Sequence, residues 1–198
     1  VIALGLFTEG YNIVWFGANM LIAFLNGIAA SMITLALMPY FESLFTITTQ
    51  QSLLELSNLN HPLLKRLMIT APGTYQHSLM VANLSETAAE NINADAVLCR
   101  VGAYYHDIGK MKRPLFFTEN QFSGENPHNT LTPRMSKIII SSHTKDGLEL
   151  AIKYKLPKII QDFIAEHHGT TMVSFFYSQA LKKEDNMDHD ESTKDEFR

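Results

Sequence analysis

The sequence contains very little cysteine, and it has no excess of basic residues. Its 198 residues include one cysteine, Cys99, which excludes an internal disulfide framework and fits a reducing compartment. The formal net charge of −4 and the pI near 6.1 give no basic surface, so long nucleic acid is not an expected partner. Neither an internal repeat nor a convincing strand pattern is present, and the chain from about residue 42 onward is therefore predicted to be all-α.

Charge is also missing from one long stretch, because residues 10–41 contain no Asp, Glu, Lys or Arg. Within it, residues 17–38 are mostly apolar, and about 20 such residues span the hydrocarbon core of a bilayer. Trp15 and Tyr40 flank this run, as interfacial aromatic residues often do. A buried core helix is the alternative, which the length of the uncharged run disfavours. The pattern predicts a transmembrane helix over about 17–38, closed or kinked at Pro39.

The first residues are apolar as well, and they lack the initiator Met and basic region of a signal peptide. We interpret residues 1–41 as the end of a multi-pass membrane region, which makes the sequence an internal part of a larger protein of the cell membrane. Asn19, Asn26 and Ser31 indicate that one face of the span packs on other transmembrane helices of the same protein, with membrane lipid around the rest.

The remaining chain is predicted to contain a connection, a helical domain and a tail. Apolar positions between Leu44 and Leu56 predict an amphipathic connecting helix within residues 42–62, which either transmits movement or serves as a passive spacer. The domain is expected over 63–181. An acidic, mobile loop or tail is expected over 182–198, where apolar residues are scarce.

Cap and turn residues divide the domain into helices. Helix starts are predicted after a turn and N-cap in Pro72-Gly73-Thr74, near Asn93 to Asp95, at Thr132-Pro133, near Lys145 and at Pro157. Gly109 is expected to stop the second of these helices, and the third is expected to end at His143. The irregular segment 112–132 is predicted to be a loop that folds over the functional site.

Five histidines and one aspartate recur through this helical stretch. They are His77, His106, Asp107, His143, His167 and His168. Neutral imidazoles and carboxylates are the ligands that hold first-row divalent metals. Six potential ligands exceed the needs of one metal with open positions, so the pattern predicts a two-metal site, and such sites perform phosphoryl chemistry. A single histidine on an apolar face is more often a core residue. Five of them, four at expected helix ends, favour a metal-dependent phosphodiesterase.

Several neighbouring residues have two possible roles. Lys110 either contacts a substrate phosphate or balances a helix dipole. Thr170 and Thr171 either hydrogen-bond phosphate or cap a turn. Tyr104 and Tyr105 offer aromatic faces to a base, although at least one of them is expected in the core.

The spacing of the six residues resembles the binuclear branch of the HD-domain phosphohydrolase superfamily. Segments 71–78, 102–110 and 166–171 are more specifically similar to the PgpH family of bacterial seven-transmembrane proteins, whose cytoplasmic HD domain hydrolyses cyclic di-AMP. The resemblance covers roughly residues 15–180. It implies an HD-domain helical bundle on the cytoplasmic side of the membrane, with cyclic di-AMP as substrate and linear pApA as product.

The resemblance also implies roles for individual residues. Asp107 would bridge two metals, with His77 and His106 on one metal and His143, His167 and His168 on the other. A hydroxide held between the two ions would attack phosphorus. Mixed histidine and carboxylate ligation suits iron or manganese, with zinc as the remaining candidate. The implied catalytic residues are His106, Asp107 and Lys110. The implied substrate contacts are Lys110, Thr170, Thr171 and Tyr105.

One feature of the family has no counterpart in this sequence. The family has a distal Asp on a helix after the two adjacent histidines. Here the later aspartates, Asp185, Asp188, Asp190 and Asp195, all fall in the polar tail. The HD domain is therefore expected to be incomplete at its C-terminal side.

Two alternatives remain at this stage. The HD-GYP branch hydrolyses cyclic di-GMP and has Gly-Tyr-Pro after its histidine pair, where this chain has Gly169-Thr170-Thr171. A non-catalytic nucleotide-binding membrane receptor is the alternative from another class, but such a protein needs no set of six ligands. Whether the protein forms a homodimer is left open.

Overall fold

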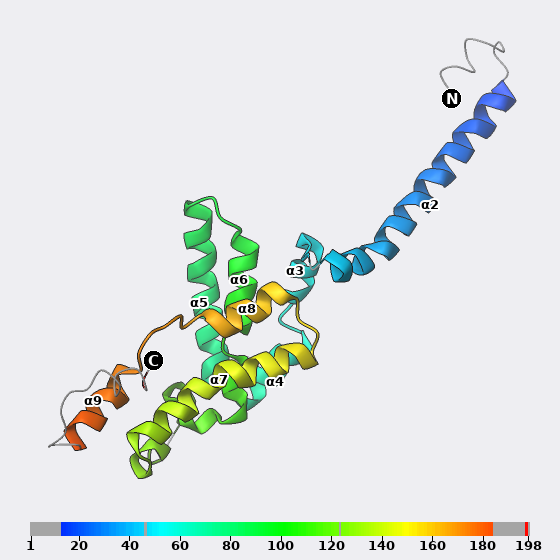
Figure 1. Ribbon diagram of the computed structural model, residues 1–198. Helices are drawn as coiled ribbons and strands as arrows, with labels where there is room; N and C mark the ends of the chain where they lie inside the picture. The colour runs from blue at the N-terminus through cyan, green and yellow to red at the C-terminus, as the bar shows by residue number, and fades with distance from the viewer. Residues whose placement is uncertain (1–12, 46, 123, 184–196, 198) are drawn as a thin grey trace. The chain divides into compact units, whose positions relative to one another are not determined.

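The structure is a computed structural model that describes residues 13–45, 47–122, 124–183 and 197. The chain divides into two units, Val1–Ile47 and Thr48–Arg198. Every regular element within the described ranges is helical and none is a strand (Figure 1), which confirms the all-α prediction.

The first unit contains helix α2, Ile13–Phe45. Its segment Val14–Glu42 has a mean hydropathy of 2.1 and is long and apolar enough to cross a membrane, by length and composition alone. Pro39 lies inside the helix, so of the two predicted alternatives an end at Pro39 is wrong, and a kink there stays a prediction. Asn19 donates a hydrogen bond to the carbonyl of Trp15, and Ser31 donates to that of Gly27. These polar side chains therefore find acceptors within their own helix. Packing against other transmembrane helices stays a prediction.

The second unit begins with two short helices, α3 (Gln50–Leu56) and α4 (Pro62–Thr70). The connecting helix predicted over 42–62 is therefore divided, because α2 takes its first residues and a non-helical stretch precedes α3. Thr49 caps α3 by accepting a hydrogen bond from the Ser52 amide. His61 caps α4 in the same way through its Nδ1.

Helices α5 (Pro72–Asn91) and α6 (Ala96–Tyr105) stand side by side (Figure 1). Asp95 caps α6, as predicted, by accepting from the Leu98 amide at 2.9 Å. The turn and N-cap predicted within residues 72–74 are wrong, because α5 already starts at Pro72 and its N-cap is Ala71. Pro72 takes the first helical position, where the missing amide hydrogen costs nothing.

Two further helices complete the main body, α7 (Pro133–Lys153) and α8 (Lys158–Glu166). Thr132 caps α7 as predicted, by accepting from the Met135 amide. The break predicted between His143 and Lys145 is wrong, and a single helix runs through both. No proline interrupts this stretch, so the hydrogen-bond ladder continues.

The segment between α6 and α7 folds into four short 3₁₀ turns. They are η1 (Ile108–Lys112), η2 (Pro114–Phe116), η3 (Thr118–Asn120) and η4 (Pro127–Thr130). Gly109, expected to stop α6, instead lies inside η1, and α6 already ends at Tyr105. A last helix, α9 (Ser174–Lys183), follows α8 and packs against α7.

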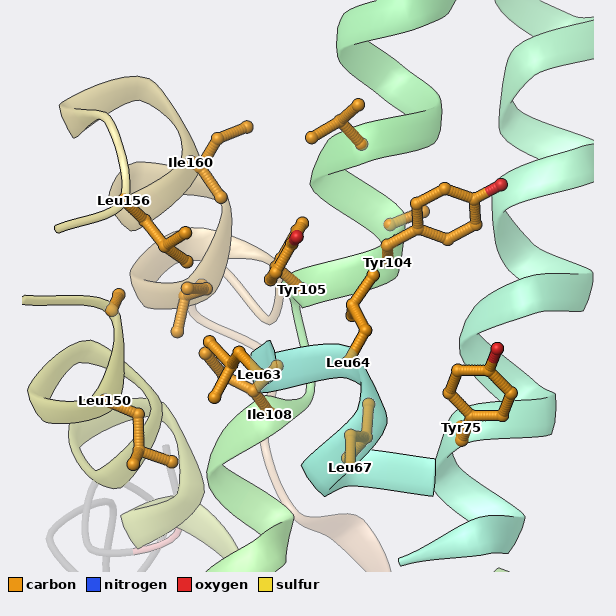
Figure 2. Packing of buried hydrophobic residues seen from close by; sticks show 14 of the residues in the cluster. Leu63, Leu64, Leu67, Tyr75, Tyr104, Tyr105, Ile108, Leu150, Leu156 and Ile160 are labelled. Carbon is orange, nitrogen blue, oxygen red and sulfur yellow. The ribbon is translucent and has the colours of Figure 1, made fainter. Parts of the chain in front are cut away.

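The main core takes residues from each α-helix from α3 to α8 and from η1, and Figure 2 shows part of it. Its fully buried members include Leu63, Leu67, Tyr105, Ile108 and Ile160. Burying one large aliphatic side chain contributes about 1.5–3 kcal/mol. Tyr105 and Ile108 flank the pair His106-Asp107, so core packing fixes the backbone of that pair on both sides.

A second, small apolar cluster contains Phe176, Ala180 and Phe197. The carbonyl of Phe197 accepts a hydrogen bond from the Val173 amide at 2.8 Å. Of the acidic tail predicted over 182–198, the structure describes Lys182, Lys183 and Phe197. The other residues of that tail lie outside the described residues.

Candidate metal centre

His106 and Asp107 lie at the C-terminal end of α6, as the sequence predicts. His106 is the C-cap of that helix, and Asp107 precedes η1. The fully buried neighbours Tyr105 and Ile108 hold the backbone of the pair in place. Asp107 is itself only 3% exposed.

The other four histidines come from three helices. His77 lies in the second turn of α5. His143 lies in the middle of α7, so its predicted position at a helix end is wrong. His167 is the C-cap of α8, and His168 follows it.

The structure brings all six predicted ligands together in two groups. One group is Asp107, His143, His167 and His168, and the other is His77, His106 and Asp107. Within each group the candidate ligand atoms lie within 4.8 Å of one another. Asp107 belongs to both groups, which is the position required of a carboxylate that bridges two ions.

Asp107 is surrounded by imidazole nitrogens. Its Oδ2 lies 3.0 Å from His106 Nε2, and its Oδ1 lies 3.4 Å from His143 Nε2 and 3.6 Å from His167 Nε2. Oδ1 is buried and has no hydrogen-bond partner among the described residues. An unpaired buried carboxylate oxygen is costly, and a cation between Oδ1 and the imidazoles would remove that cost.

Backbone carbonyls determine which nitrogen of each ring is available to a metal. The Nδ1 atoms of His106 and His167 lie 2.7 Å and 3.0 Å from the carbonyls of Ala103 and Ile164, three residues earlier in each case. Since a carbonyl can only accept, Nδ1 carries the hydrogen and Nε2 keeps its lone pair. His143 makes the same bond to the carbonyl of Ile140.

The Nε2 atoms of three histidines then lie close to one another. His143 Nε2 lies 3.2 Å from Nε2 of His167 and 3.2 Å from Nε2 of His168. The lone pairs of His143 and His167 repel at that distance unless a cation lies between them. Ligand atoms about 2.1 Å from one ion are themselves about 3.0–3.4 Å apart, so this donor set fits a divalent metal.

The ionisation states also suit metal binding. Burial acts to raise the pKa of Asp107, but the close imidazoles of His106 and His167 and the charge of Lys110 hold it well below its usual range. Burial lowers the pKa of His143, and burial together with the neighbouring imidazoles lowers the pKa of His168 to about 4. Asp107 is therefore anionic and His143 and His168 are neutral at pH 7.

Lys110 lies inside the site and is not a solvent-exposed lysine at a helix end. Its Nζ lies 2.9 Å from Asp107 Oδ2 and 2.8 Å from Glu119 Oε1, and its side chain is 14% exposed. The charges of the two carboxylates raise the pKa of Lys110 against the opposing effect of burial. Sequence reasoning missed Glu119, because it lies in a loop with no periodicity to connect it with the His-Asp pair.

The loop after η1 covers this site, as predicted. We call residues 113–120, which include η2 and η3, the strap. The ring of Phe117 lies 5.8 Å from the ring of His143, and Lys110 Nζ lies 5.0 Å from the Phe117 centroid. The strap therefore brings an aromatic ring and a carboxylate to the candidate metal ligands.

The predicted substrate contacts have different outcomes. Tyr105 is fully buried, and its hydroxyl donates to the carbonyl of Leu56 at 3.0 Å. Its ring has no free face for a base, so the substrate contact assigned to Tyr105 is corrected to a structural role. Thr170 and Thr171 are exposed beside the histidine pair, and the Thr171 amide donates to the carbonyl of His168. The aspartates of the predicted tail lie outside the described residues.

Comparison with known proteins gives a consistent result. The sequence profile of the HD domain family matches residues 74–194. The cyclic-di-AMP phosphodiesterase PgpH of Bacillus subtilis (strain 168) is 50% identical over 182 residues, which are 92% of this chain. The PgpH of Listeria monocytogenes serotype 1/2a (strain 10403S) is 51% identical over 166 residues, 84% of this chain.

A solved structure is similar as well. The crystal structure of the L. monocytogenes PgpH HD domain in complex with cyclic di-AMP has a TM-score of 0.65 and 48% sequence identity, over 71% of this chain and 64% of that one. The chain spans 25% and 23% of the lengths of the two curated relatives.

Proposed function

The chain belongs to the HD domain family, and from that premise we propose that it is a metal-dependent phosphodiesterase that hydrolyses cyclic di-AMP to linear pApA. One observation carries the proposal, namely that six ligands form two groups that share Asp107. A domain that only binds a nucleotide has no need for two adjoining ligand groups. The substrate follows from the relatives, which are named cyclic-di-AMP phosphodiesterases.

The two groups would hold two divalent ions, with iron or manganese best suited to the nitrogen and oxygen donors. Such ions supply an activated water as nucleophile at neutral pH and offset charge on the phosphoryl oxygens. The backbone carbonyls orient the imidazoles beforehand, so little rearrangement is needed when metal binds.

The remaining residues act on the substrate. Lys110 presents an ammonium next to Asp107 and would bind a non-bridging phosphate oxygen. Phe117 shields His143 and Lys110 from water on one side, which strengthens the electrostatic interactions there. Thr170 and Thr171 are exposed next to His168, within the part of the site that a substrate approaches from solvent.

We also propose that the protein lies in the cell membrane, in a multi-pass arrangement with the HD domain on the cytoplasmic side. The length and composition of α2 support a membrane span, and a cytoplasmic domain would meet an intracellular dinucleotide.

The test is a competition assay on the full-length protein purified in detergent. With Mn²⁺ and equal amounts of cyclic di-AMP and cyclic di-GMP, we expect cyclic di-AMP to disappear first, with pApA as the product resolved by chromatography. The double variant His106→Ala/Asp107→Ala should be folded and inactive. Turnover of neither dinucleotide by a metal-loaded wild type, or full activity in the double variant, would contradict the proposal.

A further inference from the structure

Glu119 forms an ion pair with Lys110, although Glu119 is not one of the six candidate metal ligands. We propose that Glu119 is a positioning residue, which holds the Lys110 ammonium beside the substrate phosphate once metal ions occupy the centre. The inference rests on the proposed function and extends it from the ligands to the strap.

The contact of Glu119 with Lys110 is short and shielded. Glu119 Oε1 accepts a hydrogen bond from Lys110 Nζ at 2.8 Å and a second from Thr74 Oγ1 at 3.0 Å. Two donors on one oxygen fix the direction of the carboxylate. Because Lys110 is 14% exposed and Phe117 covers its ammonium, water screens this pair less than a surface ion pair.

The strap is in turn anchored to the first turn of α5. Asn120 donates from its Nδ2 to Thr74 Oγ1 at 2.8 Å, and its Oδ1 accepts from the Thr74 amide at 3.1 Å. Both residues are buried. A β-carbon at Gly73 would lie 1.8 Å from the carbonyl oxygen of Glu119, so the strap backbone touches α5 directly. Glu119 therefore has a fixed position relative to the helix that carries His77.

Metal binding would change the electrostatic balance around Lys110. Its two ion-pair partners among the described residues are Asp107 and Glu119. Dications bound to Asp107 would offset the attraction of that carboxylate for Lys110 and would repel the ammonium. Glu119 is then the remaining anion that keeps Lys110 close to the centre.

The same balance explains why the charge of Glu119 matters more than its shape. Glutamine retains an oxygen that can accept from Thr74, but it lacks the charge that counters repulsion between Lys110 and the metals. Removing only the charge should therefore leave the strap in place and release the ammonium. A misplacement of about 1 Å in an active site can lower the rate roughly 100-fold.

The experiment compares Glu119→Gln with Glu125→Gln, an exposed carboxylate of the same inter-helix segment, in the full-length protein. We expect Glu119→Gln to lower kcat for cyclic di-AMP roughly 10- to 100-fold, with a smaller change in KM. Metal content per chain and the thermal unfolding midpoint should stay at wild-type values. Glu125→Gln should resemble wild type in every measurement.

A double-mutant cycle separates positioning from an independent effect. If Glu119 acts through Lys110, then Lys110→Ala/Glu119→Gln should lose no more activity than Lys110→Ala alone. Additive losses, an unchanged kcat in Glu119→Gln, or loss of metal from that variant would each overturn the inference. These results require an active wild type, so they are distinct from failure of the proposed function, in which the wild type hydrolyses no cyclic dinucleotide.

Discussion

A β-carbon placed on Gly109 would stand 1.8 Å from the carbonyl oxygen of His143, and 2.5 Å from the Gly147 amide nitrogen. Turn η1, which follows Asp107, and helix α7, which carries His143, are therefore in backbone contact beside these two proposed metal ligands. This contact sets the separation of Asp107, two residues before Gly109, from His143. The absence of a side chain at Gly109 thus brings Asp107, the proposed bridging carboxylate, to the second ligand group.

The first prediction concerns Gly109→Ala. The added methyl group must push η1 away from α7, since backbone atoms of α7 cannot rotate aside. We expect a destabilisation of about 1–3 kcal/mol in chemical unfolding, and weaker binding of metal at the group that contains His143. Gly27→Ala is the matched control, because nothing lies within 4 Å of a β-carbon there. Wild-type metal affinity in Gly109→Ala would show that the contact does not set the ligand distance.

The second prediction uses the unequal membership of the two ligand groups. His168 belongs to one group and His77 to the other, whereas Asp107 belongs to both. Metal content should therefore fall from about two ions per chain to about one in His168→Ala and in His77→Ala. It should fall below one in Asp107→Asn.

Elemental analysis after removal of free metal measures these values. His128→Ala is the control, because His128 lies outside both groups and its Nε2 contacts the carbonyl of Phe116. Equal metal loss in His168→Ala and Asp107→Asn would contradict a bridging role for Asp107.

The sequence predicted the candidate ligand residues better than it predicted the contacts that hold them in place. Residue type and number were enough to select the six residues that the structure brings together as candidate ligands, because few other arrangements use so many histidines. The position of His143 in mid-helix was not predicted, because a helix was expected to end at this residue. No helix-breaking residue directly follows His143, so the helix continues. What brings His143 to Asp107 is a contact with Gly109, a residue expected to do no more than end a helix.

Residues of the strap illustrate a second limit. Glu119 and Phe117 lie in a segment without periodic apolar positions, so no pattern assigns them a direction. Their contacts depend on the fit of Asn120 and Thr74, which are 46 residues apart in sequence. Such long-range polar contacts are specified by packing of the whole domain, which local propensity does not report.

The third prediction concerns stability and pH in the metal-free protein. Burial, followed by the proximity of His167 and His143, lowers the pKa of His168 to about 4 in the folded state. The unfolded chain binds the proton near pH 6.5, so folding favours the neutral ring. The resulting stability is present above pH 6.5 and is lost as the pH falls from 6.5 towards 4. Burial lowers the pKa of His143 and shifts its contribution in the same direction.

Urea unfolding at several pH values between about 7.5 and 4.5 would measure this effect, because most of the protonation change of His168 falls roughly within that range. The midpoint of wild type should fall with acidification, and that of His168→Gln should fall less. His106 acts in the opposite sense: burial lowers its pKa, but the hydrogen bond and charge of Asp107 outweigh this and raise it. The variant comparison removes that contribution, because both proteins contain His106. Parallel curves for the two proteins would contradict the assignment to His168.

The last prediction tests the corrected role of Tyr105. Its hydroxyl donates to the carbonyl of Leu56, and so joins α6 to the end of α3. Tyr105→Phe would leave that carbonyl without its partner and should destabilise the domain by about 1–3 kcal/mol. Because the ring is fully buried, KM for cyclic di-AMP should not change. Tyr104→Phe is the control: Tyr104 is also buried, but no side-chain hydrogen bond of its hydroxyl is found among the described residues. A higher KM in Tyr105→Phe with unchanged stability would restore Tyr105 as a substrate contact, and would require α3 to move away from the core when the nucleotide binds.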